Sequence, residues 1–115
     1  MSDTTRKPYS DWVTEYPETV VLSKERFLYV VYNESALVIG NLLGYNVRRT
    51  QKGNLCTGGP NKVKIMNKLT ENQVSYVVIE NNMVVDHETF TDNHFNDFLD
   101  DSIVTDGNKK ATPVE

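Results

Sequence analysis

Basic side chains gather in the middle of the sequence, where they could neutralise the phosphate groups of a nucleic acid. Residues 23–80 hold eight Lys and Arg residues and four acidic residues. The two ends of the chain together hold four Lys and Arg residues and twelve acidic residues. Cations that contact phosphates release counterions, so such binding weakens as salt rises. A solvated surface between acidic, solubilising ends explains the same pattern and stays open. The candidate phosphate-binding residues are Arg48, Arg49, Lys52, Lys62, Lys64 and Lys68.

The residue types that carry out catalysis or bind metals form no recognisable set. Asp86-His87-Glu88 and His94 lack the spacing of a metal site, because only two histidines and one distant cysteine are present. Cys56 has no nearby base in the sequence that could activate it as a nucleophile, and a small apolar core residue is the better interpretation. The sequence therefore predicts a non-catalytic protein without a metal or cofactor.

Length and composition fit one ordinary globular domain. The chain has 115 residues, of which 38% are hydrophobic and 24% charged. A single cysteine excludes a disulfide within the chain and is typical of a reducing cytoplasm. No apolar run is long enough to cross a membrane, and the polar N-terminus lacks the pattern of a signal peptide. We therefore expect a cytoplasmic protein with no membrane partner.

The first half of the chain predicts a strand, a helix and a hairpin. Residues 26–32 are β-branched and aromatic with two apolar faces, which favours a strand covered on both sides. Residues 33–43 place apolar side chains at helical spacing, and Gly44 supplies the left-handed residue that ends such a helix. Residues 45–51 and 54–57 then read as two strands joined by a turn at Gly53.

The second half predicts a helix, a strand hairpin and a short final helix. Residues 61–71 predict a helix with a buried stripe of Val63, Met66 and Leu69 and with Ile65 beside it, which leaves Lys64 and Lys68 outward. The apolar residues 74–80 predict a central strand, which turns at Asn81-Asn82 into a less buried strand over residues 83–90. Residues 93–103 carry apolar side chains at the spacing of a short amphipathic helix.

These elements predict an α/β (α+β) domain in which a mixed β-sheet is flanked by helices. We expect a mobile N-terminal arm over residues 1–18, in which Trp12, Val13, Tyr16 and Pro17 can dock on the domain in extended form or as a short turn. The domain then spans residues 19–104, and residues 105–115 form a disordered tail.

In order, these elements resemble the N-terminal domain of the DNA mismatch repair protein MutS. The resemblance covers about half of the chain and implies the same mixed sheet flanked by helices. In that family a Phe-Tyr-Glu strand leads through an aromatic residue and an acidic turn into a helix that starts with Ala and ends in Leu-Gly. A Gly-x-Pro motif and a strand ending in an acidic residue follow. The corresponding residues are Leu28-Tyr29-Val30, Tyr32, Asn33-Glu34-Ser35, Ala36, Leu43-Gly44, Gly58-Gly59-Pro60 and Val77-Val78-Ile79-Glu80.

The two residues with which the family reads mismatches are replaced in this alignment. The family's Phe wedges into the minor groove and stacks on the mismatched base, and its Glu hydrogen-bonds that base. Leu28 and Val30 stand at these positions. Leu28 could still act as an apolar wedge, but Val30 cannot hydrogen-bond through its side chain. No GxxxxGK[ST] phosphate-binding loop is present either.

Two functions remain open from the sequence. The first is a stand-alone module of MutS-like ancestry that binds DNA through its basic hairpin and helix, with Leu28 as a wedge, without reading mismatches. The second is a protein-interaction or regulatory adaptor that keeps the fold and binds a protein partner or a second copy through an exposed sheet edge. A basic surface clear of the acidic ends favours the first, and a large apolar patch at the sheet edge or around Leu28 favours the second.

Overall fold

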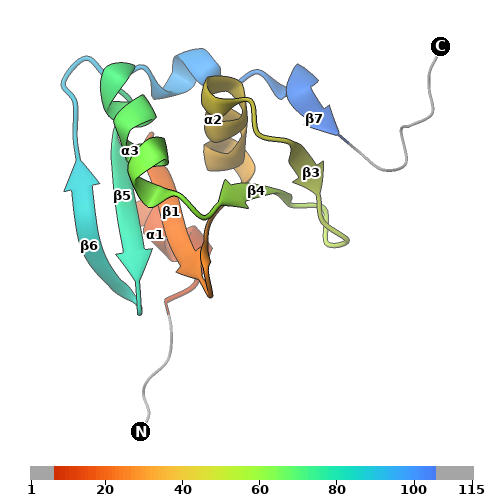
Figure 1. Ribbon diagram of the computed structural model, residues 1–115, viewed down its shortest axis with the longest axis horizontal. Helices are drawn as coiled ribbons and strands as arrows, with labels where there is room; N and C mark the ends of the chain where they lie inside the picture. The colour runs from red at the N-terminus through yellow and green to blue at the C-terminus, as the bar shows by residue number, and fades with distance from the viewer. Residues whose placement is uncertain (1–6, 106–115) are drawn as a thin grey trace, which may run out of the picture.

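A computed structural model describes residues 7–105 of the chain (Figure 1). Seven strands form one mixed sheet in the order β6-β5-β1-β2-β4-β3-β7. The pairs β1–β5 and β3–β7 are parallel and the other four are antiparallel, so the predicted α/β class with a mixed sheet is confirmed. The elements are α1 (Tyr9–Glu15), β1 (Val20–Glu25), β2 (Leu28–Tyr32), α2 (Asn33–Leu43), β3 (Val47–Arg49), β4 (Leu55–Gly59), α3 (Lys62–Glu71), β5 (Tyr76–Glu80), β6 (Met83–Glu88), the 3-10 turns η1 (Phe95–Phe98) and η2 (Asp101–Ile103), and β7 (Val104–Thr105).

The sheet is covered by helices on both faces (Figure 1). Alternate residues of β1 point to opposite faces, and they belong to two separate core clusters. Leu22 packs in the larger cluster with Ile39 of α2 and Ile65 of α3, and all three are fully buried. Val21 packs in the smaller cluster with Trp12 of α1. The core therefore consists of one thick layer under α2 and α3 and one thin layer under α1.

The helix and turn residues predicted from the sequence mostly have the expected roles. Helix α2 covers residues 33–43, and Gly44 ends it with φ of 76°. Gly53 in the β3–β4 turn has φ of 89°, and both Asn81 and Asn82 in the β5–β6 turn have positive φ. These backbone angles are those that glycine and asparagine tolerate best.

Helix α3 is confirmed, but its buried stripe differs from the prediction. Ile65 and Leu69 are fully buried and Met66 packs against the main core as predicted, whereas Val63 is 61% exposed. Residues 65 and 69 are four apart and lie on one side of the helix, and Val63 falls on the opposite side. The sequence predicts the helical spacing. Packing against the sheet decides that the row of Ile65 and Leu69 is buried and that Val63 faces outward.

The helix predicted over residues 93–103 is wrong, because this segment forms the two separate 3-10 turns. The side-chain amide of Asn41 donates hydrogen bonds to the backbone oxygens of Phe98 and Asp100, at 2.6 and 3.1 Å. These bonds hold the carbonyl groups toward α2, and Asp100 itself is extended. The apolar side chains of Phe95, Phe98 and Ile103 still pack on the main core. The predicted apolar side chains are thus packed on the core, although the backbone that carries them is not one continuous helix.

Part of the expected N-terminal arm forms α1 on the sheet. Trp12 is 8% exposed and stacks on Tyr16 with ring centroids 6.4 Å apart. Trp12 and Tyr16 dock as expected, from a helix and its C-terminal end rather than from an extended segment or a turn, whereas Val13 and Pro17 are exposed. Residues 1–6 of the arm and 106–115 of the tail lie outside the described residues, and the division into arm, domain and tail stays a prediction.

Asn93 joins three segments, and we expect its loss to destabilise the fold. Its side-chain oxygen accepts hydrogen bonds from the backbone N–H groups of Ser75 and Phe95, and its amide donates to Glu18 O at 2.7 Å. N93A leaves these backbone groups without partners, which should lower the free energy of unfolding by about 1–3 kcal/mol. Urea denaturation measures this change. N93D keeps the acceptor oxygens and should lose less, and a midpoint for N93A equal to that of the wild type would contradict the role.

Candidate nucleic-acid interface

The hairpin that joins β1 to β2 projects the most exposed apolar side chain among the described residues. Glu25 pairs with Leu28, so the turn itself consists of Arg26 and Phe27. Phe27 is 85% exposed and Leu28 is 45% exposed. Arg26 has φ of 63°, in the left-handed region where glycine is favoured. We call residues 24–28 the hairpin tip.

Phe27 is the residue that the sequence prediction missed. The sequence predicts one buried strand over residues 26–32, but β2 begins at Leu28, and Arg26 and Phe27 form the turn before it. A signal was present, since the charged run Lys24-Glu25-Arg26 separates two apolar segments. Charged residues between two apolar strands are typical of a hairpin turn.

Two cations of the tip lie outside the salt bridges that residues 7–105 form, although Lys24 lies close enough to Glu80 to help lower the pKa of that carboxyl. Lys24 and Arg26 form no salt bridge with any residue in the range 7–105. The acidic residue between them, Glu25, accepts a hydrogen bond from the Tyr32 hydroxyl at 2.9 Å. The exposed Phe27 thus lies beside two cations that are available to an anionic partner.

Lys62 lies at the same end of the sheet but is already paired. Its ammonium is 3.2 Å from Glu80 Oε2 and 5.7 Å from the centre of the Tyr29 ring. The Tyr29 hydroxyl donates a hydrogen bond to the same carboxylate at 2.9 Å. That hydrogen bond, together with the one from Lys62, lowers the pKa of Glu80, and the bond to Glu80 raises the pKa of Lys62. Contact with a phosphate would therefore have to compete with Glu80.

The cations of the β3–β4 hairpin lie at the other end of the sheet. Strand β4 runs antiparallel to β2, so its first residues pair near Tyr32 rather than near the tip. Arg48 and Arg49 are neighbours on β3 and point to opposite faces. Arg49 also donates a hydrogen bond to Gly53 O at 3.2 Å. Lys52 is exposed in the turn between the two strands.

Lys64 and Lys68 occupy a third position, on the outer side of α3. Lys64 lies 5.9 Å from the centre of the Tyr45 ring, and Lys68 is 3.9 Å from Glu71. Both line a groove of about 590 Å³ against the C-terminal end of α2. The six predicted cations are therefore divided among three places, and only Lys62 lies near Leu28 and the tip.

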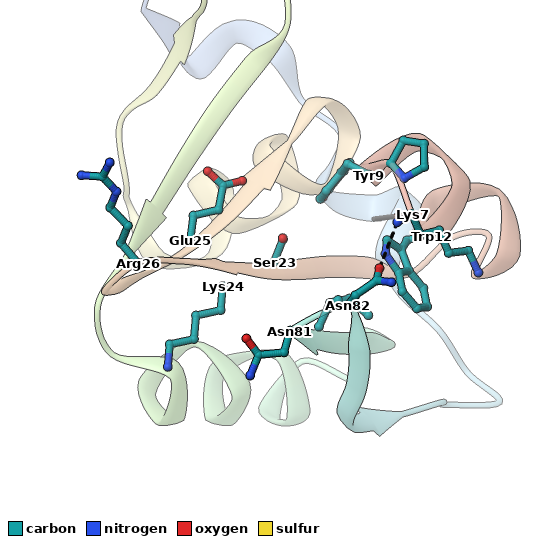
Figure 2. Close-up of a pocket in the computed structure, with 11 residues that line it drawn as sticks. Lys7, Tyr9, Trp12, Ser23, Lys24, Glu25, Arg26, Asn81 and Asn82 are labelled. Atoms are coloured by element: carbon teal, nitrogen blue, oxygen red, sulfur yellow. Dashed lines mark hydrogen bonds between the residues drawn. The ribbon is translucent and has the colours of Figure 1, made fainter. Parts of the chain in front are cut away.

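A larger groove opens beside the hairpin tip (Figure 2). It has a volume of about 1010 Å³ and runs between the end of β1, the β5–β6 turn and the start of α1. The backbone N–H of Lys7 donates a hydrogen bond to Asn82 Oδ1 at 3.0 Å, and the Lys7 ammonium lies 4.0 Å from the centre of the Trp12 ring. These contacts fix the α1 wall. The lining residues are Lys7, Pro8, Tyr9, Trp12, Ser23, Lys24, Glu25, Arg26, Ile79, Asn81 and Asn82.

Other side chains with possible chemistry give no competing site within residues 7–105. No group of three His, Cys, Asp or Glu in this range could hold a metal ion. Cys56 is partly buried, and burial raises the pKa of its thiol, which disfavours the reactive thiolate. The helices in the same range are too short or too polar to span a bilayer.

The fold and the tip together describe a small α/β module with an exposed aromatic and basic hairpin. The chain matches no protein-family model, and no curated protein is significantly similar to it.

Proposed function

We propose that this protein is a non-catalytic nucleic-acid-binding module that inserts its hairpin tip between bases. The observation that carries this proposal is the 85% exposure of Phe27 between Leu28 and Arg26, which forms no salt bridge with residues 7–105. An exposed phenylalanine gains nothing from the core, and its flat face can stack on a base. Wedge residues of this kind partly unstack a base step and bend the duplex. The neighbouring cations would neutralise the phosphates beside the wedge.

The exposed Phe27 stands one residue before Leu28, where the MutS resemblance places the wedge. The wedge was expected at Leu28, but a shift of the alignment by one residue places the family's Phe at Phe27 and its Glu at Tyr29. The Tyr29 hydroxyl is bound to Glu80. Its proton is thus engaged and the Tyr29 side chain is 9% exposed, which supports binding without mismatch reading.

The first test of the proposal is binding of fluorescent DNA at two salt concentrations. We expect the anisotropy of labelled matched duplex, mismatched duplex and single strand to rise with protein, and the affinity to fall with salt. Tighter binding to the mismatch would show that a wedge suffices for mismatch reading. No binding at low salt would reject the proposal.

Removing the two tip cations should weaken binding equally for all sequences. In the variant K24A/R26G, glycine suits the left-handed φ at residue 26, so the fold should be as stable as the wild type or more so. If both cations contact phosphates, the slope of log affinity against log salt should decrease by about 2. Anisotropy titrations at several salt concentrations measure the slope, and thermal unfolding measures the stability.

The matched control is R48A/R49A, which removes two cations at the far end of the sheet. We expect it to change the salt slope less than K24A/R26G does. A larger effect of R48A/R49A would move the interface to the β3–β4 hairpin, together with Lys52, and would contradict the proposed role of the tip.

A protein-interaction adaptor is the second candidate, and the exposed apolar side chains of the edge strand β6 favour it. Met83 and Val85 on this strand are 62% and 45% exposed. However, β6 carries a bulge opposite Val78 and Ile79 and has the acidic residues Asp86 and Glu88, and such features block pairing of sheet edges. Replacing Met83 by Lys would abolish binding to a protein partner at this edge and leave DNA binding by the tip unchanged. Gel filtration of the wild type and M83K over a range of concentrations tests the case in which the partner is a second copy.

A further inference from the structure

We propose that the groove between α3 and the C-terminal end of α2 binds an acidic peptide segment of a partner protein, and that this segment carries at least one large apolar side chain. The two helices cover the same face of the sheet (Figure 1), and we call the site the α2–α3 groove. None of the tip residues 24–28 lines it, so the inference does not rest on the proposed function. It assigns a role to Lys64 and Lys68, which nucleic-acid binding by the tip leaves unused.

Apolar side chains line the α2–α3 groove from both helices. Leu42 and Leu43 lie in the last turn of α2 and are partly buried, and Val63 lies on α3 with 61% exposure. Burial of these side chains against a partner would remove apolar surface from water. The volume of about 590 Å³ lies within the range of about 300–1,000 Å³ that is typical of binding pockets, so the groove can take the side chains of a short segment.

Two cations of α3 determine the charge of the occupant. Lys64 and Lys68 are four residues apart, so their side chains are neighbours on the helix surface. Lys64 lies outside the salt bridges that residues 7–105 form and is 5.9 Å from the centre of the Tyr45 ring. Lys68 is 3.9 Å from Glu71, but both side chains are exposed, and such pairs are weak enough to exchange partners. Carboxylates are therefore the groups that complement this groove.

The mixture of lining groups favours a peptide over a nucleic acid. A sugar-phosphate backbone would pair with the two lysines but would leave the three apolar side chains without a contact. The exposed amide of Asn67 also lines the groove, and it has no hydrogen-bond partner in the part of the chain that the structure describes. An amide can both donate to and accept from a peptide backbone. Apolar, cationic and amide groups together match an acidic segment with an apolar anchor.

The helix ends assign positions to the residues of the bound peptide. The C-terminal end of α2 is the negative end of its dipole, and Glu71 adds a negative charge at the C-terminal end of α3. Both ends repel carboxylates. The acidic residues of the peptide therefore pair with the two lysines, more strongly with Lys64 because it is farther from Glu71. The apolar side chain of the peptide lies against Leu42 and Leu43.

The first test selects binders from a library of random short peptides displayed on phage. We expect the immobilised wild-type chain to enrich peptides in which Asp and Glu flank Leu, Ile, Phe or Trp. A counter-selection on the variant V63A/K64A/K68A removes peptides that bind elsewhere on the molecule. No enrichment after the counter-selection, or enrichment of basic or purely apolar peptides, would overturn the proposal.

The second test measures the affinity of the most enriched peptide by fluorescence anisotropy. K64A/K68A should weaken binding by about two- to thirtyfold, as the loss of two exposed ion pairs would, and K64A alone should lose more than K68A alone. V63A should weaken binding by about fivefold, because two methyl groups lose their contact. The control R48A/K52A removes two cations outside the groove and should bind the peptide as the wild type does. Alanine favours helices, so thermal unfolding should show that the α3 variants remain folded.

A peptide in which Asn and Gln replace Asp and Glu tests the ion pairing directly. This peptide should bind the wild type more weakly, and K64A/K68A should cause little further loss, because the same ion pairs are already absent. Losses that simply add would show that the lysines and the acidic residues do not meet, and the proposal would fail.

The remaining outcomes separate the α2–α3 groove from other uses of the same surface. If K64A/K68A lowers the salt slope of DNA binding by about 2, the two lysines contact phosphates and the peptide site is refuted. If the wild type dimerises in gel filtration and V63A does not, the occupant is a second copy, which also refutes it. F27A should bind the peptide with full affinity, so a failure of DNA binding by the tip leaves the groove unaffected.

Discussion

Replacing Phe27 by alanine should weaken nucleic-acid binding by about tenfold or more and leave the fold intact. Stacking of one base on an aromatic side chain contributes about 1–3 kcal/mol, which corresponds to roughly five- to 150-fold in affinity. The side chain is 85% exposed, so its removal takes almost nothing from the core. Anisotropy titrations measure the affinity, and thermal unfolding of F27A shows whether stability is unchanged.

The control for F27A is V63A, which removes an apolar side chain of 61% exposure from α3. We expect V63A to bind as the wild type does, because Val63 lines the groove between α3 and the C-terminal end of α2 and not the groove beside the tip. F27W should keep the affinity, since tryptophan also presents a flat face for stacking. Wild-type affinity in F27A, or an equal loss in V63A, would show that Phe27 is not a wedge.

Replacing Gly58 by alanine should cause a large loss of stability. A β-carbon at this position would lie 2.4 Å from the backbone oxygen of Tyr29 and 3.0 Å from Val30 Cα. Gly58 pairs with Val30 in the β2–β4 ladder, so the clash involves backbone that cannot move without breaking the sheet. Overpacking of this kind costs about 1–3 kcal/mol, and we expect the upper end here. The melting temperature should fall by about 10 °C or more.

G59A is the matched control for G58A. A β-carbon at Gly59 would lie 3.3 Å from atoms of the Tyr45 ring, which is a side chain that can shift. We therefore expect G59A to lose less than 1 kcal/mol, on the order of a tolerated core change. Equal urea midpoints for the two variants would contradict the argument from backbone contact. Because β2 carries the tip at its start, G58A should also weaken DNA binding, whereas G59A should not.

The sequence by itself determined the helices and turns whose signals are local. Apolar spacing identified α2 and α3. Gly44 marked the end of α2, and Gly53 and the Asn81-Asn82 pair marked the turns of the β3–β4 and β5–β6 hairpins. These features depend on backbone conformations that only a few residue types accept. The class of fold followed from the order of the elements, because strands alternating with helices have few ways to bury both faces of a sheet.

The position of the candidate site was decided only by the tertiary structure. Helical spacing indicates that Lys64 and Lys68 are exposed, but it does not indicate which end of the sheet they reach. The two paired strands place Phe27 at a turn, and the parallel pairing of β1 with β5 brings Asn81 to the same end. The break at residues 93–103 likewise depends on Asn41, more than fifty residues away. Contacts between segments far apart in the chain determine which exposed residues form a common surface, and local patterns in the sequence do not contain them.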